Sequence, residues 1–268
     1  MASSRHRIIK LTETGSTNKD AMRLALAGEP LPLWICAERQ SEGRGRAGRV
    51  WVSDAGNLQA SLALTCQAPL QSAGQLSFVA GIALIEAVRA ISPLAQSVGL
   101  RLKWPNDLLI GPAKAGGILV ETTTARGEPT FHEGPTFQQG QGFLAIIGFG
   151  LNVTTCPPDL GRAATSLAAN GIAVTPDTVL EALADHSEIW IKHWDNGRCF
   201  GDMRQAWLER AGAIGEAITV NAACGPVSGT YQGLAPDGAL LVEVAGQIET
   251  FTYGDVALIA PSEESSGQ

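Results

Sequence analysis

The sequence predicts an α+β fold, in which a larger domain of helices and strands is followed by a small β-barrel domain. Up to residue 212, stretches with apolar residues at helical spacing lie among short β-like stretches. After Gly212 the chain has only short β-like stretches separated by turns such as PDG, which is typical of a small barrel. Apolar residues make up 45% of the 268 residues, which permits a sizeable core. We therefore expect domains at 1–212 and 213–262 and a disordered tail at 263–268.

The first hundred residues contain two predicted helices and two predicted strands. A helix is expected over 16–27, because Ser16 is a favourable N-cap ahead of an apolar-periodic stretch. LWICAE, at 33–38, indicates a buried strand, and residues 58–65 alternate as a strand does. Apolar residues then recur at helical spacing over 75–91, which predicts a second helix.

The rest of the larger domain is predicted to add strands and helices. LRLKWPNDLLI indicates a strand, a turn and a strand, because Pro, Asn and Asp favour turns. GGILVE and FLAIIGFGLNV indicate further strands. Apolar periodicity predicts helices around 180–194 and 198–210. Residues 122–141 are rich in Thr, Gly, Pro and Gln, so we expect a mobile loop there.

Charge, cysteine content and the N-terminus limit the class of protein. The net charge of −7 disfavours DNA as a partner, because duplex-binding proteins carry a basic excess. The five cysteines lack C-x-x-C spacing, which disfavours a disulfide framework and a zinc site. No signal peptide is evident, and the apolar run 142–151 is too short to span a bilayer. We expect a soluble cytoplasmic protein without a membrane partner.

Residues 43–49, GRGRAGR, fit the glycine spacing of a dinucleotide-binding loop, but their surroundings do not. Such a loop runs directly into a helix whose N-terminus holds the pyrophosphate. Here VWVSDAGN comes next, which is not a helical sequence, and the acidic residue expected about 20 positions later is missing. No Walker A pattern occurs either. The match to the dinucleotide fingerprint is therefore a coincidence of spacing.

An anion cradle is a better interpretation of the same loop. Glycines allow successive N–H groups to point at one anion, and guanidinium groups grip phosphate or carboxylate oxygens in pairs. Arg44, Arg46 and Arg49 on one short loop repel each other unless an anion is bound. A solvated basic turn is the alternative interpretation of this stretch alone.

Two further segments carry candidate chemistry. In KWPND, at 103–107, a tight turn would direct Asn106 and Asp107 at one point, where they could hold Mg²⁺. The alternative is an ordinary hairpin turn of the same composition. Lys114 precedes Gly116 and Gly117, where a side chain can extend past exposed backbone; the alternative is a surface lysine.

Taken together, these motifs resemble those of the biotin protein ligases. They are S-T-N at 16–18 with Gln40, GRGRAGR at 43–49 with Trp51, KWPND at 103–107, KAGGILVE at 114–121 and GFGLN at 148–152. The resemblance covers about residues 10–260 and five motifs in order. It implies a mixed-sheet catalytic domain, residues 1–212, that binds biotin and ATP, followed by an SH3-like β-barrel domain, residues 213–262. It identifies the monofunctional type, without an N-terminal DNA-binding domain.

The resemblance implies an enzyme that works in two steps. Biotin and ATP give biotinyl-5′-AMP, and a lysine of a biotin carboxyl carrier domain, from acetyl-CoA carboxylase or a related carboxylase, then takes the biotinyl group. Mg²⁺ is the implied cofactor, and the implied assembly is a monomer or a homodimer. A lipoate or octanoate ligase or transferase of the same fold is one alternative. A non-catalytic sensor of biotin or nucleotide is an alternative of a different class.

The resemblance also assigns roles to individual positions. The implied catalytic residues are Lys114, Arg46 and Asp107. The implied biotin-binding residues are Ser16, Thr17, Asn18, Gln40, Gly43, Arg44, Gly45, Arg46, Lys114 and Gly116. The implied ATP- or adenylate-binding residues are Arg46, Arg49, Trp51, Lys103, Asn106 and Asn152. Asn106 and Asp107 are the implied ligands of Mg²⁺. Val50 and Ala115 differ from the residues usual in the family, which bears on the shape of the pocket.

Overall fold

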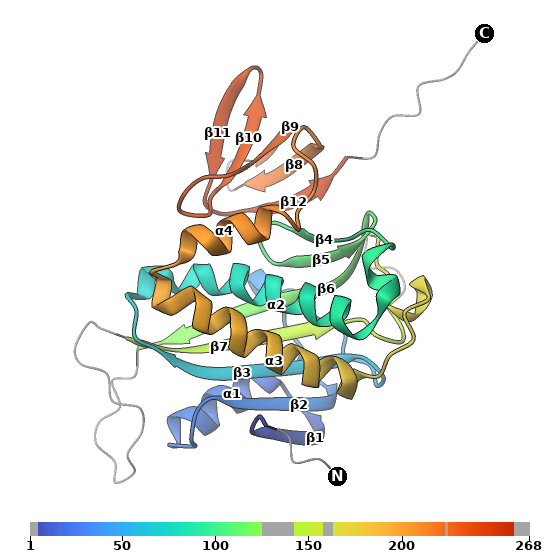
Figure 1. The fold of residues 1–268 in the computed structure, drawn as a ribbon, viewed down its shortest axis with the longest axis vertical. Helices are drawn as coiled ribbons and strands as arrows, with labels where there is room; N and C mark the ends of the chain where they lie inside the picture. The colour runs from blue at the N-terminus through green and yellow to red at the C-terminus, as the bar shows by residue number, and fades with distance from the viewer. Residues whose placement is uncertain (1–4, 125–141, 158–162, 223–224, 260–268) are drawn as a thin grey trace.

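The computed structural model describes residues 5–124, 142–157, 163–222 and 225–259. These residues form a mixed seven-stranded sheet with the order β1-β2-β3-β7-β6-β5-β4 (Figure 1). β1 and β2 run parallel, and the other neighbouring pairs are antiparallel. The strands are β1 (Ile8–Thr14), β2 (Leu33–Gln40), β3 (Leu58–Cys66), β4 (Leu100–Lys103), β5 (Asp107–Ile110), β6 (Ala113–Thr123) and β7 (Phe143–Leu151).

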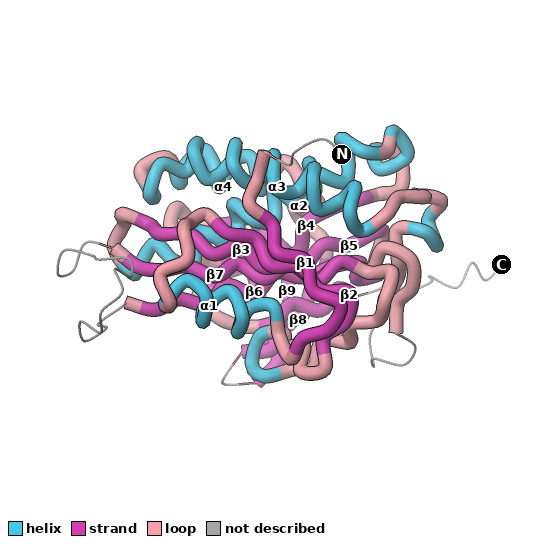
Figure 2. Tube along the Cα trace, turned by 90° about the horizontal axis from the view of Figure 1, so that it is seen from below, coloured by secondary structure: helices cyan, strands magenta, loops and turns pink. Residues whose placement is uncertain are grey.

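Helices cover both faces of this sheet (Figure 2). α1 (Thr17–Leu26) lies on one face, whereas α2 (Gln75–Ile91) and α3 (Pro176–Trp194) lie on the other. Thr175 caps α3 by accepting a hydrogen bond from the Thr178 N–H. α4 (Phe200–Leu208) comes after α3 and packs on α2 and on the C-terminal sheet.

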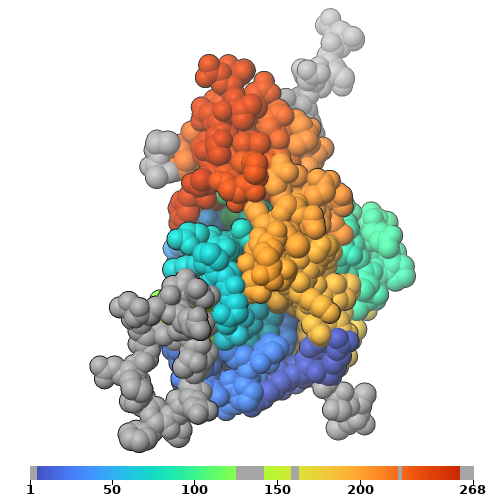
Figure 3. Space-filling view, turned by 60° about the vertical axis from the view of Figure 1, so that its left-hand side comes forward, coloured from blue at the N-terminus to red at the C-terminus, as the bar shows by residue number. Residues whose placement is uncertain are grey.

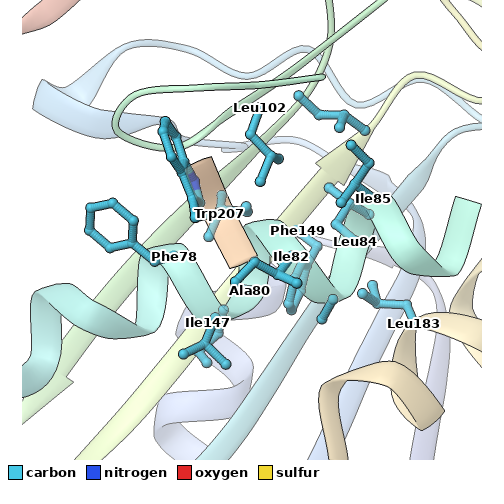
Figure 4. Packing of buried hydrophobic residues seen from close by; sticks show 14 of the residues in the cluster. Phe78, Ala80, Ile82, Leu84, Ile85, Leu102, Ile147, Phe149, Leu183 and Trp207 are labelled. Carbon is cyan, nitrogen blue, oxygen red and sulfur yellow. The ribbon is translucent and has the colours of Figure 1, made fainter. Parts of the chain in front are cut away.

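The main core lies between the sheet and α2 and α3 (Figure 4). α2 is buried on most sides, and its Phe78 packs edge-on against Trp207 of α4, with ring centroids 5.6 Å apart. From the sheet, alternate residues of β7 such as Ile147 and Phe149 point into the same core. Leu70–Ile91 is long and apolar enough to cross a membrane by composition, but most of this segment is buried, as expected of a core helix.

The opposite face of the sheet is divided between a small core and polar residues. At one end α1 packs through Ala21 and Ala25 against Ile35 of β2 and Leu144 and Ile146 of β7. Further along β7 the residues on this face are Gly148 and Gly150. Because glycines leave space above the strand, this end of the face has room for polar side chains.

The described residues of the C-terminal domain lie at one end of the molecule (Figure 3). They form a second, antiparallel sheet. Its order is β11-β10-β9-β8-β12. In the described residues β11 and β12 are edge strands that do not pair with each other, so the predicted small β domain is confirmed, with a sheet that is not closed into a complete barrel. The strands are β8 (Ala217–Ala222), β9 (Gly225–Leu234), β10 (Leu240–Val244), β11 (Gln247–Phe251) and β12 (Asp255–Leu258).

The structure bears out most of the elements predicted from periodicity. The helices over 16–27 and 75–91 are found as α1 and α2, and the predicted mixed sheet is confirmed. β1 was not predicted from the sequence. Of the predicted loop 122–141, β6 accounts for the first two residues, while 125–141 and the tail 263–268 lie outside the described residues.

Candidate active site

A cavity of about 870 Å³ opens beside the glycines of β7 and extends to the C-terminal sheet. Most of the residues singled out in the sequence line it: Ser16, Thr17, Asn18, Gln40, Arg44, Gly45, Arg46, Arg49, Trp51, Lys103, Asn106, Asp107 and Lys114. Among the described lining residues, six are Lys or Arg and three are Asp or Glu. A chain with a net charge of −7 therefore concentrates positive charge at this cavity, which suits an anionic ligand.

The glycine-arginine loop is a tight hairpin. Gly43 O accepts from the Trp51 N–H at 2.9 Å, and the Gly45 N–H donates to Arg49 O at 2.7 Å. At its tip Ala47 and Gly48 have positive φ angles of 53° and 72°. Beyond a three-residue 3₁₀ turn over Arg46–Gly48, no helix follows in the described residues of this segment. This confirms that the loop is not a dinucleotide-binding turn.

The arginines of this loop contact acidic groups from other parts of the fold. Arg49 donates to Asp255 of β12 at 2.8 Å, and Arg46 lies 3.5 Å from the same carboxylate. Arg46 also lies over the Tyr253 ring, 5.6 Å from its centroid. Arg44 lies 3.5 Å from Glu121 of β6. An anionic ligand would therefore share these guanidinium groups with carboxylates supplied by the protein.

Trp51 packs against the backbone of β7 at Gly150, where a side chain on the strand would displace the indole ring. A Cβ added to Gly150 would lie 2.4 Å from Cε2 of the Trp51 indole, closer than real contacts allow. The Lys114 ammonium lies 5.7 Å from the centroid of the indole ring, within the range of a cation–π interaction. Gly150 thus fixes the position of the aromatic ring that flanks Lys114.

A network of polar side chains forms the end of the cavity beside α1. Gln40 Oε1 accepts from the Thr17 N–H at 2.8 Å, and Gln40 Nε2 donates to Ser53 at 2.9 Å. Ser61 Oγ lies 2.7 Å from Thr17 Oγ1 and 2.6 Å from Asn18 Oδ1. Ser53 and Ser61 were not singled out in the sequence, and Glu121 was included only as the last residue of the KAGGILVE motif, without a role.

Lys114 reaches the cavity through a β-bulge. The β5–β6 register pairs Leu108 with Gly116 but Leu109 with Lys114, so Ala115 is an extra residue. The bulge brings the Lys114 side chain over Gly117 rather than Gly116, and a Cβ on Gly117 would lie 3.1 Å from Lys114 Nζ. The small residues after Lys114 thus direct and accommodate its ammonium group.

Asp107 lies between two ammonium groups. Lys114 donates to one carboxylate oxygen, and Lys103 Nζ lies 3.0 Å from the other. Burial by itself raises the pKa of Asp107, but attraction by Lys114 and Lys103 outweighs it, so the pKa lies below its ordinary value. Lys103 also donates to the Val256 carbonyl of β12 at 2.7 Å, which ties this group to the C-terminal sheet.

This arrangement does not fit the predicted magnesium site at Asn106 and Asp107. Both Asp107 oxygens face ammonium groups, and Asn106 Oδ1 accepts from Arg46 at 3.4 Å. A divalent cation at these oxygens would meet three positive groups at close range. Within the part of the chain that the structure describes, no group of three or more His, Cys, Asp or Glu residues forms a metal site.

Asp107→Asn is expected to lower the free energy of unfolding by about 3 kcal/mol near neutral pH, because two partly buried ammonium groups lose their counter-charge. Since the folded-state pKa of Asp107 is lowered, its contribution is fully present above the unfolded pKa of about 3.9 and declines as the pH falls below it. Urea unfolding of Asp107→Asn and of the unaltered protein measures the difference between their free energies of unfolding. This difference should be constant between about pH 7 and pH 5 and smaller near pH 3. A difference unchanged near pH 3 would contradict this role.

Three predicted site residues are not among the described residues that line the large cavity. Gly43 is packed against Trp51 O, and Gly116 against Gly150 O, so both lie where the backbone is crowded. Asn152 is buried and donates to Thr165 O at 3.0 Å, and it lines a smaller cavity beside Trp51 and Lys114. Their assignment to biotin or ATP binding stays a prediction.

Known proteins are similar to this chain over most of its length. Residues 6–133 match the model of the biotin/lipoate A/B protein ligase family, and residues 213–258 match that of the biotin protein ligase C-terminal domain. A biotin–acetyl-CoA-carboxylase ligase of Paracoccus denitrificans is 35% identical over 87% of this chain and 92% of its own length. The enzyme of the same name from Mycobacterium tuberculosis is 31% identical over 92% of this chain and 86% of its own length.

A solved structure resembles the whole described fold. The biotin protein ligase of Aquifex aeolicus, determined in complex with biotin and ATP, superposes with a TM-score of 0.74. It is 25% identical in sequence, and the match covers 95% of this chain and 99% of the other.

Proposed function

Since the chain belongs to the biotin/lipoate A/B protein ligase family, we propose that it is a biotin–carboxyl-carrier-protein ligase. The enzyme activates biotin with ATP as biotinyl-5′-AMP and transfers the biotinyl group to a lysine of a carrier domain. The chemistry is ATP-dependent formation of an amide bond, with AMP and pyrophosphate as products. Mg²⁺ enters with ATP as the counter-ion of its phosphates.

The observation that carries this proposal is the large cavity that joins a polar end, at Thr17 and Gln40, to a cationic end, at Lys114 and Arg46. Biotin has the matching polarity, with a polar ureido ring at one end and a carboxylate at the other. ATP would bring its α-phosphate to that carboxylate at the cationic end. The volume of about 870 Å³ lies within the range of sites for ligands of this size.

In the first step a biotin carboxylate oxygen attacks the α-phosphorus of ATP, and pyrophosphate leaves. Two anions must meet, so the site has to cancel their repulsion and hold them in line. Lys114, which has little exposure to solvent, would lie between the carboxylate and the α-phosphate. Arg46 and Arg49 would bind the phosphates, in exchange for part of their contact with Asp255.

In the second step the carrier lysine attacks the acyl carbon of the mixed anhydride, an amide bond forms, and AMP leaves with the bonding electrons. The attacking amine also loses a proton, which passes to water. Asp107 stays ionised because of Lys114 and Lys103, so it is a poor general base, and both of its oxygens already face those two ammonium groups. We assign Asp107 the role of positioning Lys114 and Lys103 at the reacting groups.

The polar end of the cavity favours biotin over a lipoyl or octanoyl substrate. A purely aliphatic chain would cover the polar side chains of Thr17, Asn18 and Gln40 without offering them a hydrogen bond, which makes its burial there less favourable. The ureido ring of biotin supplies both donors and an acceptor. Retention of the cationic end argues against a sensor without catalytic activity.

Biotin-dependent release of pyrophosphate from Mg·ATP tests the first step. We expect release with biotin and little with octanoate or lipoate at the same concentration. Release with octanoate or lipoate but not with biotin would assign the protein to the sister activity. Binding of biotin without any release of pyrophosphate would indicate a sensor without catalytic activity.

Gly150→Ala is expected to reduce the rate of pyrophosphate release by at least about tenfold, because the new Cβ displaces Trp51 and the Lys114 ammonium beside it. Gly201→Ala in α4 is the matched control, since nothing lies within 4 Å of the position of its Cβ. Steady-state rates and melting temperatures of both variants should be compared. Equal rates for the two folded variants would show that the position of Trp51 is unimportant.

A further inference from the structure

Glu121 closes the polar network at the end of the cavity beside α1. Its Oε2 accepts from Asn18 Nδ2 at 2.7 Å, and its Oε1 lies 3.5 Å from the Arg44 guanidinium. Asn18 itself is 6% exposed, and a Cβ on Gly148 would lie 2.3 Å from its Oδ1. Asn18 therefore has a fixed position between Glu121 and Ser61.

The protonation of these groups dictates the direction of every hydrogen bond in the network. An ionised carboxylate only accepts, so Asn18 must present its NH₂ group to Glu121 and its oxygen to Ser61. Ser61 has one hydroxyl proton, which the Asn18 oxygen requires. The short contact between Ser61 Oγ and Thr17 Oγ1 then needs the proton of Thr17.

This direction decides what the cavity offers to a ligand. Thr17 Oγ1 lies 3.0 Å from Gln40 Oε1 and 2.7 Å from Ser61 Oγ, and its single proton can serve only one of them. When Ser61 takes that proton, the Thr17 N–H, at 2.8 Å, is the Thr17 group that donates to Gln40 Oε1. A carbonyl oxygen has two acceptor sites, so Gln40 retains one for a ligand donor. Gln40 lines the cavity, and a ureido N–H is a donor of the required kind.

We propose that Glu121 is a positioning residue for biotin recognition: through Asn18, Ser61 and Thr17 it orients the network so that Gln40 Oε1 accepts from the ureido ring. This inference rests on the proposed function. The negative charge of Glu121 is essential to it, because a neutral amide at this position lets Asn18 turn over. The hydrogen bonds of the network would then point the other way, with Ser61 donating to Thr17 and Thr17 donating to Gln40.

Glu121→Gln tests the proposal with almost no change in size. Titration calorimetry of the full chain with biotin should show a Kd raised by about tenfold or more, since a ureido donor loses its acceptor. The matched control is Glu42→Gln: Glu42 is exposed and also interacts with Arg44, but it bonds Lys19 rather than Asn18. It should leave the Kd unchanged.

A second variant separates orientation from structural support. Asn18→Asp combined with Glu121→Gln exchanges the amide and the carboxylate, so residue 18 again accepts from Ser61. We expect the double variant to recover most of the biotin affinity lost in Glu121→Gln. If Glu121 acted only through its contact with Arg44, the double variant would not recover the affinity. If Glu121 were needed only for folding, Glu121→Gln would lower the melting temperature instead.

An unchanged Kd in Glu121→Gln, or an equal loss in Glu42→Gln, would overturn the proposal. Loss of affinity in Glu121→Gln without recovery in the double variant would also overturn it. These outcomes differ from failure of the proposed function, in which the unaltered protein itself would show no biotin binding and no biotin-dependent pyrophosphate release.

Discussion

Lys114→Ala is expected to reduce biotin-dependent pyrophosphate release by about 10²- to 10³-fold, the range seen when one preorganised charge-stabilising group is removed. The ammonium group lies in a nearly enclosed position, 12% exposed, where its interaction with developing negative charge is weakly screened. The bulge at Ala115 and the space above Gly117 direct it into the cavity. Most of the loss should appear in kcat, because Lys114 acts on charge that shifts during phosphoryl transfer.

The control for this variant is Lys192→Ala, at an exposed position on α3. Loss of Lys114 leaves Asp107 with Lys103 as its ammonium partner, so the melting temperature has to be measured as well. A folded Lys114→Ala protein that retains more than about a tenth of the activity would contradict the role assigned to this residue.

Arg46→Ala is expected to have the second largest effect, a loss of about a hundredfold in kcat/KM for ATP. Its guanidinium group lies at the junction of three parts of the site, near Asn106, the Gly254 carbonyl and Asp255. Alanine removes both the positive charge and the paired N–H donors that suit phosphate oxygens. Initial rates at varied ATP concentration measure the effect.

Arg46→Lys distinguishes charge from geometry, since lysine keeps the charge but lacks the planar donor pair. We expect it to recover only part of the activity. Arg198→Ala, at a side chain that is 72% exposed, is the control and should behave like the unaltered protein. Equal activity of Arg46→Lys and the unaltered protein would show that a single positive charge is sufficient.

Local patterns in the sequence were enough to predict the helices and the loop chemistry. α2 could be predicted residue for residue, because its apolar periodicity continues over its whole length before Pro93. The non-helical sequence after Arg49 distinguished the glycine-arginine loop from a dinucleotide-binding turn, and the structure confirms this distinction. Such features depend on neighbouring residues alone.

Features that depend on distant residues were missed. Ser61 was not noticed, and Glu121 was quoted within KAGGILVE without a role, because the register of β3, β7 and β6 that places both beside α1 is not encoded in a local pattern. Asp255 comes from the other sheet, 209 positions after Arg46 in the chain. The surroundings of Asp107 were missed too, because only the folded chain shows that Lys103 and Lys114 lie at its two oxygens, which disfavours the predicted Mg²⁺ ligands there.

The sequence predicted the small C-terminal β domain but not how far its sheet closes, because spacing shows strands and turns but not closure. The segments after Gly212 do form short antiparallel strands, yet β12 uses its backbone carbonyl at Val256 to accept from Lys103 of the larger domain. Its neighbour Asp255 contacts Arg49. The edge of the C-terminal sheet thus contributes to the cavity.

The central claim is that the cationic cavity joins biotin to a protein lysine. The most direct test is mass spectrometry of a purified biotin carrier domain incubated with the protein, biotin and Mg·ATP. We expect the carrier domain to gain the mass of one biotinyl group, on one lysine, only when both biotin and ATP are present. A carrier domain of unchanged mass, under conditions in which a known biotin protein ligase modifies it, would contradict the account.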